Sequence, residues 1–204
     1  PTPFSVAADD PRAILDLSHP TYVDYFDNPQ LWFDYDTEGR AAYRVEDGHL
    51  LGIDYMPEEI YSWWAYTDKL SDNVYAEISA TNGDCINKDA VGFVIHSDPE
   101  TASGGYALEV SCDGNWRLRM HRTGSSPKDL VGWMPSDVIH QGKAATNRLG
   151  IWDHRRRLVL FINGQQVGKF SDTQNTYPSG TFAVYVRASQ TYNLTATFDD
   201  LAFW

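Results

Sequence analysis

Three short turn motifs constrain the fold of this chain more than any other feature of its sequence. They are Glu-Asp-Gly at 46–48, Cys-Asp-Gly at 112–114 and Ile-Asn-Gly at 162–164, and each lies between two runs of alternating or β-branched residues. Asp-Gly and Asn-Gly readily adopt the positive φ angles of tight hairpins, so each motif predicts two antiparallel strands joined by a short loop. The sequence therefore predicts an antiparallel β structure from end to end.

Short strands with turn signals between them fill the chain from residue 21 onward. The strands are predicted near 22–26, 41–46, 49–55, 60–66, 73–80, 90–97, 105–111, 115–122, 130–133, 147–153, 157–162, 165–170, 181–188 and 193–203. A single helical turn is predicted at 135–139, where Pro135 suits the first turn of a helix. So many short strands, with no sustained helical period, predict an all-β fold of two antiparallel sheets.

One domain accounts for residues 21–204. A length of 204 residues suits a single β-sandwich, and the 42% of hydrophobic residues can form a core of that size. Residues 1–20 differ from the rest, because Pro and Asp are dense there and strand alternation is absent. We predict an N-terminal arm over 1–20, in which 14–17 can pack onto the domain.

The charge of the chain excludes two classes of partner. The formal net charge is −12, and no basic stripe is present that could neutralise nucleic-acid phosphates or anionic lipid headgroups. No run of about 18 apolar residues occurs, so we expect no direct membrane insertion. Acidity is compatible with neutral glycans and with calcium as ligands.

The start of the chain and its cysteines bear on its location. The sequence begins at Pro1, without an initiator methionine or a signal peptide, so we expect an exported protein whose targeting segment has been removed. The predicted location is extracellular or on the cell surface. Cys85 and Cys112 could form one disulfide in an oxidising compartment, while two free buried thiols fit the sequence equally well.

The hairpin around the Cys-Asp-Gly turn can be read in register. A three-residue loop over 112–114, with Gly114 at positive φ, makes one face wholly apolar. The apolar pairs are then Val110–Trp116, Leu108–Leu118 and Tyr106–Met120. A two-residue loop would instead place Val110 opposite Arg117 and mix apolar with charged residues. We predict the first register, because a slip would move a hydrophobic row into water.

The opposite face of the same hairpin is polar. It carries Glu109 opposite Arg117, with Arg119 and His121 beside them. The alternation in 73–80 and 91–96 predicts further outward side chains on neighbouring strands, namely Tyr75, Glu77 and His96. The sequence thus predicts one sheet with a dry side and a solvated side of mixed charge.

Six stretches of the chain carry a resemblance to a known family. They are YFDNPQLW at 25–32, YRVEDGHLLGI at 43–53, GGYALEVSCDGNWRLRMHR at 104–122, VGWMPSDVIHQGKAATNRLGI at 131–151, LVLFINGQQVGKFSD at 158–172 and TFDDLAFW at 197–204. In these stretches the sequence resembles the concanavalin A-like lectin/glucanase jelly roll, and more closely its laminin-G-like or family 16-like domains in bacterial exported proteins. The resemblance implies a two-sheet jelly roll. It does not choose among the hydrolases, lyases, lectins and adhesion modules that share this fold.

A catalytic site is not predicted. The resemblance would imply the Glu-x-Asp-x-Glu pattern of family 16 glycoside hydrolases, which holds two carboxylates about 5–5.5 Å apart, and the sequence lacks it. Glu109 and Asp113 do not share a strand face, because Asp113 lies in a turn. Glu109 opposite Arg117 should keep a low pKa and be a poor general acid.

Calcium is the cofactor that the resemblance implies. Family relatives hold a structural ion by an Asp near the start of the last strand and by backbone carbonyls near the first strands. Asp199 of TFDDLAFW and Gly48 of VEDGHLL match these positions, and such oxygen ligands suit Ca²⁺. The alternative is that Asp199 only accepts hydrogen bonds from backbone amides.

Two adjacent tryptophans give a candidate platform for a sugar ring. Trp63 and Trp64 lie in the predicted strand at 60–66, where successive side chains point to opposite faces. One should therefore be in the core, and the other should be outward or covered by a loop. An outward ring could stack on a sugar.

The sequence as a whole predicts a non-catalytic exported module that binds carbohydrate or a surface protein on a concave polar face. The candidate ligand-binding residues are Trp63, Trp64, Tyr75, Glu77, His96, Glu109, Arg117, Arg119 and His121. The alternatives are a structural subunit that assembles with other copies of itself, and a hydrolase or lyase with an atypical site.

Overall fold

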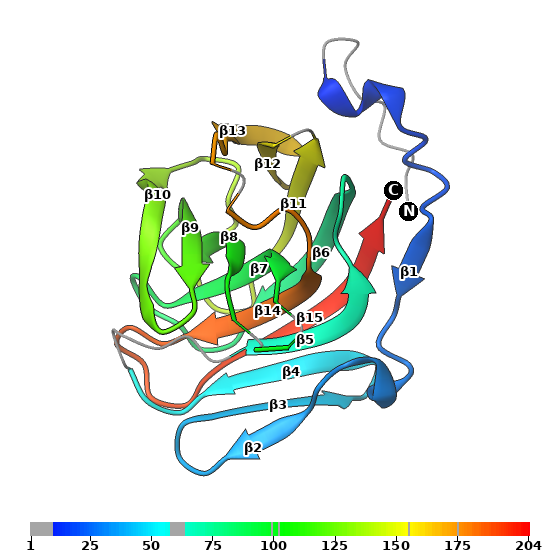
Figure 1. The fold of residues 1–204 in the computed structure, drawn as a ribbon. Coiled ribbons are helices and arrows are strands. Elements are labelled where there is room, and N and C mark those ends of the chain that lie inside the picture. Colours follow the sequence, from blue (N-terminus) through cyan, green and yellow to red (C-terminus); the bar gives the residue numbers. More distant parts are fainter. Residues whose placement is uncertain (1–9, 58–63, 99, 102, 155, 175) are drawn as a thin grey trace.

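The computed structural model of the chain describes residues 10–57, 64–98, 100–101, 103–154, 156–174 and 176–204. These residues form two antiparallel sheets that pack face to face (Figure 1). The prediction of a two-sheet antiparallel jelly roll is confirmed. Among the described residues, no helix is long and apolar enough to cross a membrane.

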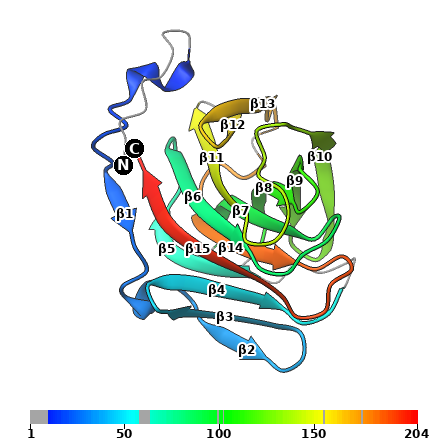
Figure 2. The same ribbon diagram turned by 180° about the vertical axis from the view of Figure 1, so that it is seen from behind.

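The larger layer, here called the large sheet, has nine strands in the described part of the chain, in the order β13-β12-β11-β6-β15-β4-β3-β2, with β1 also paired to β15. Its strands are β1 (Tyr22–Asp24), β2 (Tyr35–Thr37), β3 (Ala41–Glu46), β4 (His49–Asp54), β6 (Tyr75–Asn82), β11 (Thr146–His154), β12 (Arg157–Ile162), β13 (Gln165–Ser171) and β15 (Leu194–Phe203). β1 runs beside β15, so the first strand of the chain lies next to the last one (Figure 2).

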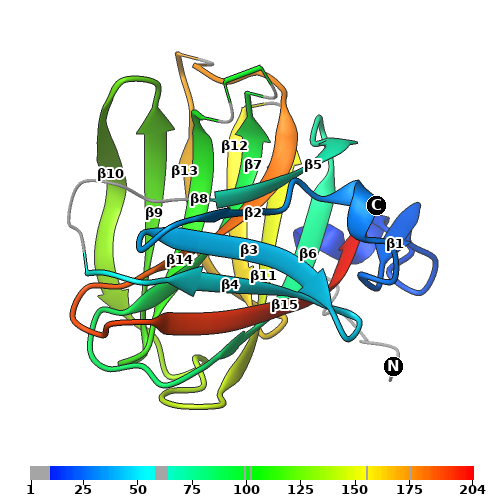
Figure 3. The same cartoon turned by 90° about the horizontal axis from the view of Figure 1, so that it is seen from below.

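The small sheet has six strands within the described ranges, in the order β10-β9-β8-β7-β14-β5. They are β5 (Trp64–Leu70), β7 (Ala90–Ser97), β8 (Gly105–Ser111), β9 (Asn115–Arg122), β10 (Ser125–Pro135) and β14 (Thr181–Arg187). Seen from below, β3, β4 and β15 of the large sheet run across β8 and β9 (Figure 3). Apolar side chains from both sheets fill the space between these layers, among them Phe93, Leu108, Ile151, Phe182 and Phe198.

The predicted register of the Cys-Asp-Gly hairpin is confirmed. Val110 pairs with Trp116, Leu108 with Leu118 and Glu109 with Arg117. Residues 112–114 form a three-residue loop between β8 and β9, and Gly114 has a φ of 78°. The hydrophobic row therefore selects the register, as the alternation predicts.

The structure departs from the predicted elements at several places. Residues 136–139 form turns and bends instead of a helix, because β10 continues to Pro135 at the edge of the small sheet, where a strand tolerates proline. The short strand β2 was not predicted, nor were the 3₁₀ turns η1 (Pro11–Ile14) and η2 (Pro29–Leu31). The predicted strand at 60–66 lies partly outside the described residues, and β5 continues to Leu70.

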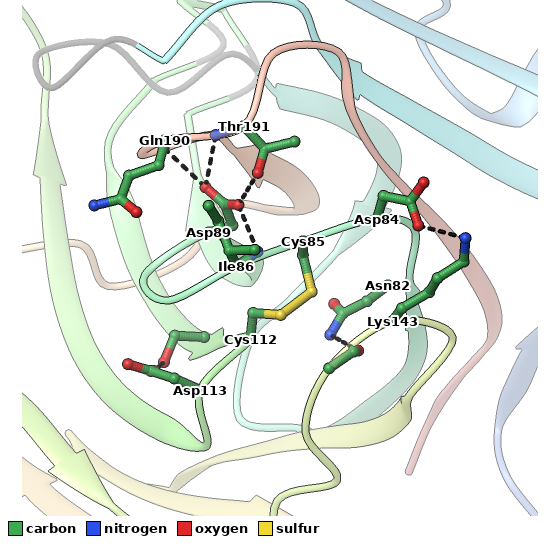
Figure 4. Close-up of a disulfide and its surroundings, with 12 residues drawn as sticks. Asn82, Asp84, Cys85, Ile86, Asp89, Cys112, Asp113, Lys143, Gln190 and Thr191 are labelled. Carbon is green, nitrogen blue, oxygen red and sulfur yellow. Dashed lines mark hydrogen bonds and ion pairs between the residues drawn. A yellow bond between two sulfur atoms is a disulfide. The ribbon is translucent and has the colours of Figure 1, made fainter.

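The two cysteines form a disulfide in the structure. Cys85 and Cys112 are bonded with their Cα atoms 6.0 Å apart, and they join the β6–β7 loop to the end of β8 (Figure 4). Asp89 lies beside this bond and accepts hydrogen bonds from the backbone amides of Ile86, Ser189 and Gln190. The disulfide and this buried carboxylate together tie three loops at one end of the sandwich.

Candidate functional site

Glu109 on β8 is the centre of a charged cluster on the face of the small sheet that is turned away from the core. Arg117, one strand away on β9, donates two hydrogen bonds to it at 2.6 and 3.1 Å. Arg187 of β14 also donates to Glu109, and the Nη1 atom of Arg119 lies 3.8 Å from it. The Glu109 side chain is fully buried.

A second carboxylate links this cluster to solvent. Asp129 of β10 accepts from Arg119 at 3.0 Å and from Arg117 at 3.4 Å. Its side chain is 41% exposed, so it forms the rim of the cluster. We call Glu109, Arg117, Arg119, Asp129 and Arg187 the Glu109 cluster; its formal charge is positive in a chain whose net charge is −12.

Burial and the nearby arginines together determine the protonation of Glu109 and His121. Burial alone would raise the pKa of Glu109, but Arg187, Arg117 and Arg119 outweigh it and lower that pKa from 4.5 to about 2. Burial lowers the pKa of His121 from 6.5 to about 4, and the positive charge of Arg119 adds to the effect. At neutral pH Glu109 is therefore ionised and His121 is neutral.

The face that bears the cluster is concave. Trp64 belongs to β5 and His121 to β9, which is four strands away and so about 19 Å along a flat sheet. The centroids of the two rings nevertheless lie 5.0 Å apart. Tyr185 of β14 also contacts both rings. The sheet must curl around this face to bring these side chains together.

Glycine makes room for one of these rings. Gly92 pairs with Tyr185, and a Cβ atom at position 92 would lie 2.2 Å from the tyrosine ring. The ring therefore lies flat on the floor of the concave face, under Trp64 and His121. Burial raises the pKa of the Tyr185 hydroxyl well above its ordinary value.

Aromatic rings flank the cluster at both edges of the small sheet. Trp64 is half-buried on the edge strand β5, and Trp133 is half-buried on the other edge strand, β10. The guanidinium carbon of Arg117 lies 4.3 Å from the Trp133 ring centroid, which is a cation–π contact. The concave face thus has charged groups between two tryptophans.

The prediction of a solvated polar face is wrong in one respect. Glu109, Arg117, Arg119 and His121 do share one face, as predicted, but all four are buried. The curvature of the sheet and the ion pairs among the side chains remove them from water. Trp64 is the outward tryptophan of the predicted pair, and Trp63 lies outside the described residues.

Tyr75 and Glu77 were expected beside Glu109, and this expectation is wrong. Their strand, β6, belongs to the large sheet, where they lie on its outer face under the N-terminal segment. Arg12 is buried there, 2.9 Å from the Tyr75 hydroxyl, and its guanidinium carbon lies 3.9 Å from the Phe161 ring centroid. Alternation along one strand gives the face of a residue but not the sheet to which the strand belongs.

His96 was expected on the solvated face, and this expectation is also wrong. The pairing of β7 with β14 shifts between Thr181–Ser97 and Ala183–Val94, so Ile95 and His96 oppose the single residue Phe182. This is a β-bulge, and His96 has a φ of 58°. The extra residue turns the His96 side chain toward the large sheet, where it lies 3.2 Å from Asp153.

Four residues of the site are absent from the predicted ligand-binding residues. They are Arg187, Tyr185, Asp129 and Trp133. The alternation Ala183, Tyr185, Arg187 would have placed the first two on one face of a strand. It could not indicate that β14 lies between β7 and β5, because that order depends on long connections.

The predicted calcium residues lie near one another, but the structure provides only part of an ion site. Asp199 on β15 is 3.7 Å from the Nε2 atom of His49, which follows Gly48 in the β3–β4 turn. Burial and the negative charge of Asp200 raise the pKa of Asp199. A nearby cation would therefore stabilise the ionised carboxylate. Across the described ranges, however, no group of three or more His, Cys, Asp or Glu side chains is placed to hold a metal ion. Backbone carbonyls would have to supply the remaining ligands.

Comparison with solved structures defines the class of fold. The carbohydrate-binding module CBM66 from Bacillus subtilis matches with a TM-score of 0.64 and 14% identity, over 86% of this chain and 96% of that one. The catalytic domain of an endo-1,3-β-glucanase (laminarinase) from Thermotoga petrophila RKU-1 matches with a TM-score of 0.59 and 14% identity, over 91% and 96%. A protein of unknown function with a galectin-like fold from Bacillus subtilis has a TM-score of 0.60 and 13% identity, over 90% and 94%.

These similarities confirm the sequence-based resemblance: the chain has the fold of a concanavalin A-like lectin/glucanase domain. No family model and no curated protein sequence matches the chain. Identities of 14% or less for these three structures support the fold alone. The neighbours include both binding modules and enzymes, so function has to be argued from the site.

Proposed function

We propose that this protein is a non-catalytic carbohydrate-binding module whose ligand lies on the concave face of the small sheet. The observation that carries the proposal is the arrangement of that face, with Trp64 and Trp133 on either side of the Glu109 cluster. Sugars present apolar ring faces that stack on aromatic side chains, and hydroxyl groups that bond to charged side chains. Asp129, at the rim of the cluster, would meet the ligand first.

The state of Glu109 supports binding without catalysis. A retaining glycosidase needs a nucleophile and an acid at a fixed separation, both in contact with the substrate. Glu109 is fully buried and paired with arginines, and its pKa of about 2 keeps it ionised at working pH. Such a carboxylate can neither reach a glycosidic bond nor deliver a proton to it.

An exported location is part of the same proposal. The Cys85–Cys112 disulfide supports it, because such bonds persist mainly in oxidising compartments. Fractionation of the source cells would test it. Recovery of the protein in the reducing cytosol with both thiols free would contradict this part of the proposal.

A glycan-array screen followed by titration calorimetry tests the binding. Trp64→Ala and Trp133→Ala should each weaken binding roughly 2- to 10-fold, since an aromatic contact contributes about 0.5–1.5 kcal/mol. Arg119→Ala should weaken it as well. Tyr192→Ala is the matched control, because Tyr192 is an exposed aromatic residue (66%) in the β14–β15 loop, outside the concave face.

Activity assays test the non-catalytic part of the proposal. Incubation with β-glucans, galactans and alginate should release neither reducing ends nor unsaturated products. Turnover that is abolished by Glu109→Gln in a folded variant would show that the protein is an enzyme. A complete lack of glycan binding would instead favour a surface protein or further copies of this chain as the partner.

A further inference from the structure

A row of aromatic residues continues from the concave face along the edge strand β5. Trp64 and Tyr66 are two residues apart on this strand, so their side chains point to the same face, roughly 6.5–7 Å apart along the strand. Both rings are half-buried, and both pack against one buried cluster of the concave face. The members of that cluster are Val94, Ala107, Ala183 and Tyr185.

Phe33 adds a third ring to this row. It lies between η2 and β2 and is 53% exposed. Its ring is nearly parallel to that of Tyr66, with an interplanar angle of 18° and the centroids 5.3 Å apart. Carbon atoms in contact are about 3.5–4 Å apart, so this centroid distance means that the two rings are offset. The outer face of Phe33 therefore continues the aromatic surface that begins at Trp64.

The position of Phe33 is fixed by the backbone. Its amide donates to the carbonyl oxygen of Tyr66 at 3.0 Å, and Trp32 forms an isolated β-bridge with Thr67. An exposed ring that is held in place in the free protein loses little conformational entropy when a ligand stacks on it. The row is therefore arranged for binding before any ligand arrives.

Carboxylates border the row. Asp68 lies on the same face of β5 as Tyr66, and its side chain is 74% exposed. Asp34 is exposed next to Phe33. Charged residues are depleted at the centre of interfaces between proteins, whereas a sugar presents apolar ring faces and hydroxyl groups together. The mixture of ring faces and carboxylates therefore fits a glycan better than an apolar protein surface.

We infer that the carbohydrate site extends along β5 onto Phe33, and that its ligand is a chain of several sugar units, longer than a disaccharide. This inference rests on the proposed carbohydrate function and names the class of its ligand. Pyranose and phenyl rings both have six members, so each aromatic ring of the row can stack on about one sugar unit. One unit contacts Trp64 beside the Glu109 cluster, and the following units continue over Tyr66 and Phe33.

Titration calorimetry with oligosaccharides of two lengths tests the inference. The probes are dimers and hexamers prepared from β-glucan, galactan and alginate. The hexamer should bind roughly tenfold more tightly than the dimer of the same polymer, because the additional ring contacts each contribute roughly 2- to 10-fold. A hexamer also has more registers in which it can occupy a short site, so the length series is combined with variants of Phe33.

Phe33→Leu is the decisive variant, because leucine is apolar but has no ring face. It should weaken hexamer binding roughly 2- to 10-fold and leave dimer binding at Trp64 unchanged. Phe33→Tyr keeps the ring and should bind the hexamer as the wild-type protein does. Tyr192→Leu is the matched control, since Tyr192 is an exposed aromatic residue (66%) in the β14–β15 loop.

Nuclear magnetic resonance of the wild-type protein gives a second measurement that needs no variant. The hexamer should produce saturable shifts of the ring signals of Phe33 and Tyr66. The dimer should leave the Phe33 ring signals unchanged.

Failure of this inference and failure of the proposed function give different results. Equal affinity for dimer and hexamer would confine the ligand to the region of Trp64, and so would hexamer binding that Phe33→Leu does not weaken. Either result would overturn the inference and leave the carbohydrate function intact. If no dimer or hexamer of the panel binds, the proposed function and the inference are both overturned.

Discussion

Glu109 is the residue on which the concave face depends most. It is fully buried and compensates the positive charge of Arg117, Arg119 and Arg187. A buried ion pair adds little net stability over an apolar pair, but the removal of one partner leaves uncompensated charge in a medium of low polarity. The cluster therefore contributes to the shape of the face more than to the total stability.

We predict that Glu109→Gln lowers the free energy of unfolding by about 3–5 kcal/mol, because the arginines lose their shared counter-charge. Urea denaturation of both proteins at pH 7 measures the change. Glu46→Gln is the matched control, since Glu46 is paired with Arg44 on the surface and such pairs contribute about 0–1 kcal/mol. Similar losses in the two variants would contradict the assigned role of Glu109.

His121 should make stability depend on pH in a defined window. Its pKa is about 4 in the folded protein and 6.5 ordinarily, so the unfolded chain binds the proton more tightly. Stability should therefore fall as the pH drops from about 6.5 to about 4, by on the order of 3 kcal/mol. His121→Gln should lack most of this slope. Denaturant unfolding at several pH values measures it, and identical slopes in the two proteins would refute the prediction.

The sequence predicts the local features of the strands, but not the features that depend on how neighbouring strands pair. The hairpin over 104–122 has the predicted register, because alternation and loop length are both local properties. The bulge at His96 was not predicted, because nothing in the alternation of 91–97 shows that two residues oppose one on the neighbouring strand. β2 was missed because three residues carry almost no periodic signal.

The disulfide should stabilise the β6–β7 region substantially. Cys85 and Cys112 are 27 residues apart. Closing a loop of that length lowers the entropy of the unfolded chain, which should raise the free energy of unfolding by about 3–4 kcal/mol. A reducing agent should therefore lower the melting temperature. The double variant Cys85→Ala, Cys112→Ala should melt low from the start and show no response to the reductant. A wild-type melting curve unaffected by complete reduction would argue against this contribution.

At the scale of the whole molecule, three polar groups that were predicted on one solvated face lie in separate parts of the structure. The division into two sheets and the curvature of the small sheet separate them. Glu109 and its arginines occupy the concave face, His96 lies beside Asp153 between the two sheets, and Glu77 lies under Arg12. Only the first of these matches the predicted position on a concave polar face. Substitutions at the proposed carbohydrate site on the concave face therefore leave the other two groups intact.

The calcium hypothesis also belongs to this scale, because Asp199 and Gly48 come from distant parts of the chain. If an ion binds there, calcium at 100 times its dissociation constant should raise the free energy of unfolding by about 2.7 kcal/mol. Thermal melting with calcium and with a chelator measures the effect. Asp199→Asn should abolish the difference. Equal melting of the wild-type protein under both conditions would exclude a stabilising ion.

The sequence by itself determined the all-β class, the three hairpin turns, the alternation of most strands and the pairing of Glu109 with Arg117. These features depend on turn chemistry and on residues close in the chain, which local patterns describe. Only the tertiary structure decided the order of strands in each sheet and the curvature that brings the rings of Trp64 and His121 into contact. It also decided the bulge that turns the His96 side chain toward the large sheet. The physical reason is that these features depend on contacts between residues far apart in sequence, where packing of the two layers selects one arrangement from many that satisfy the same alternation.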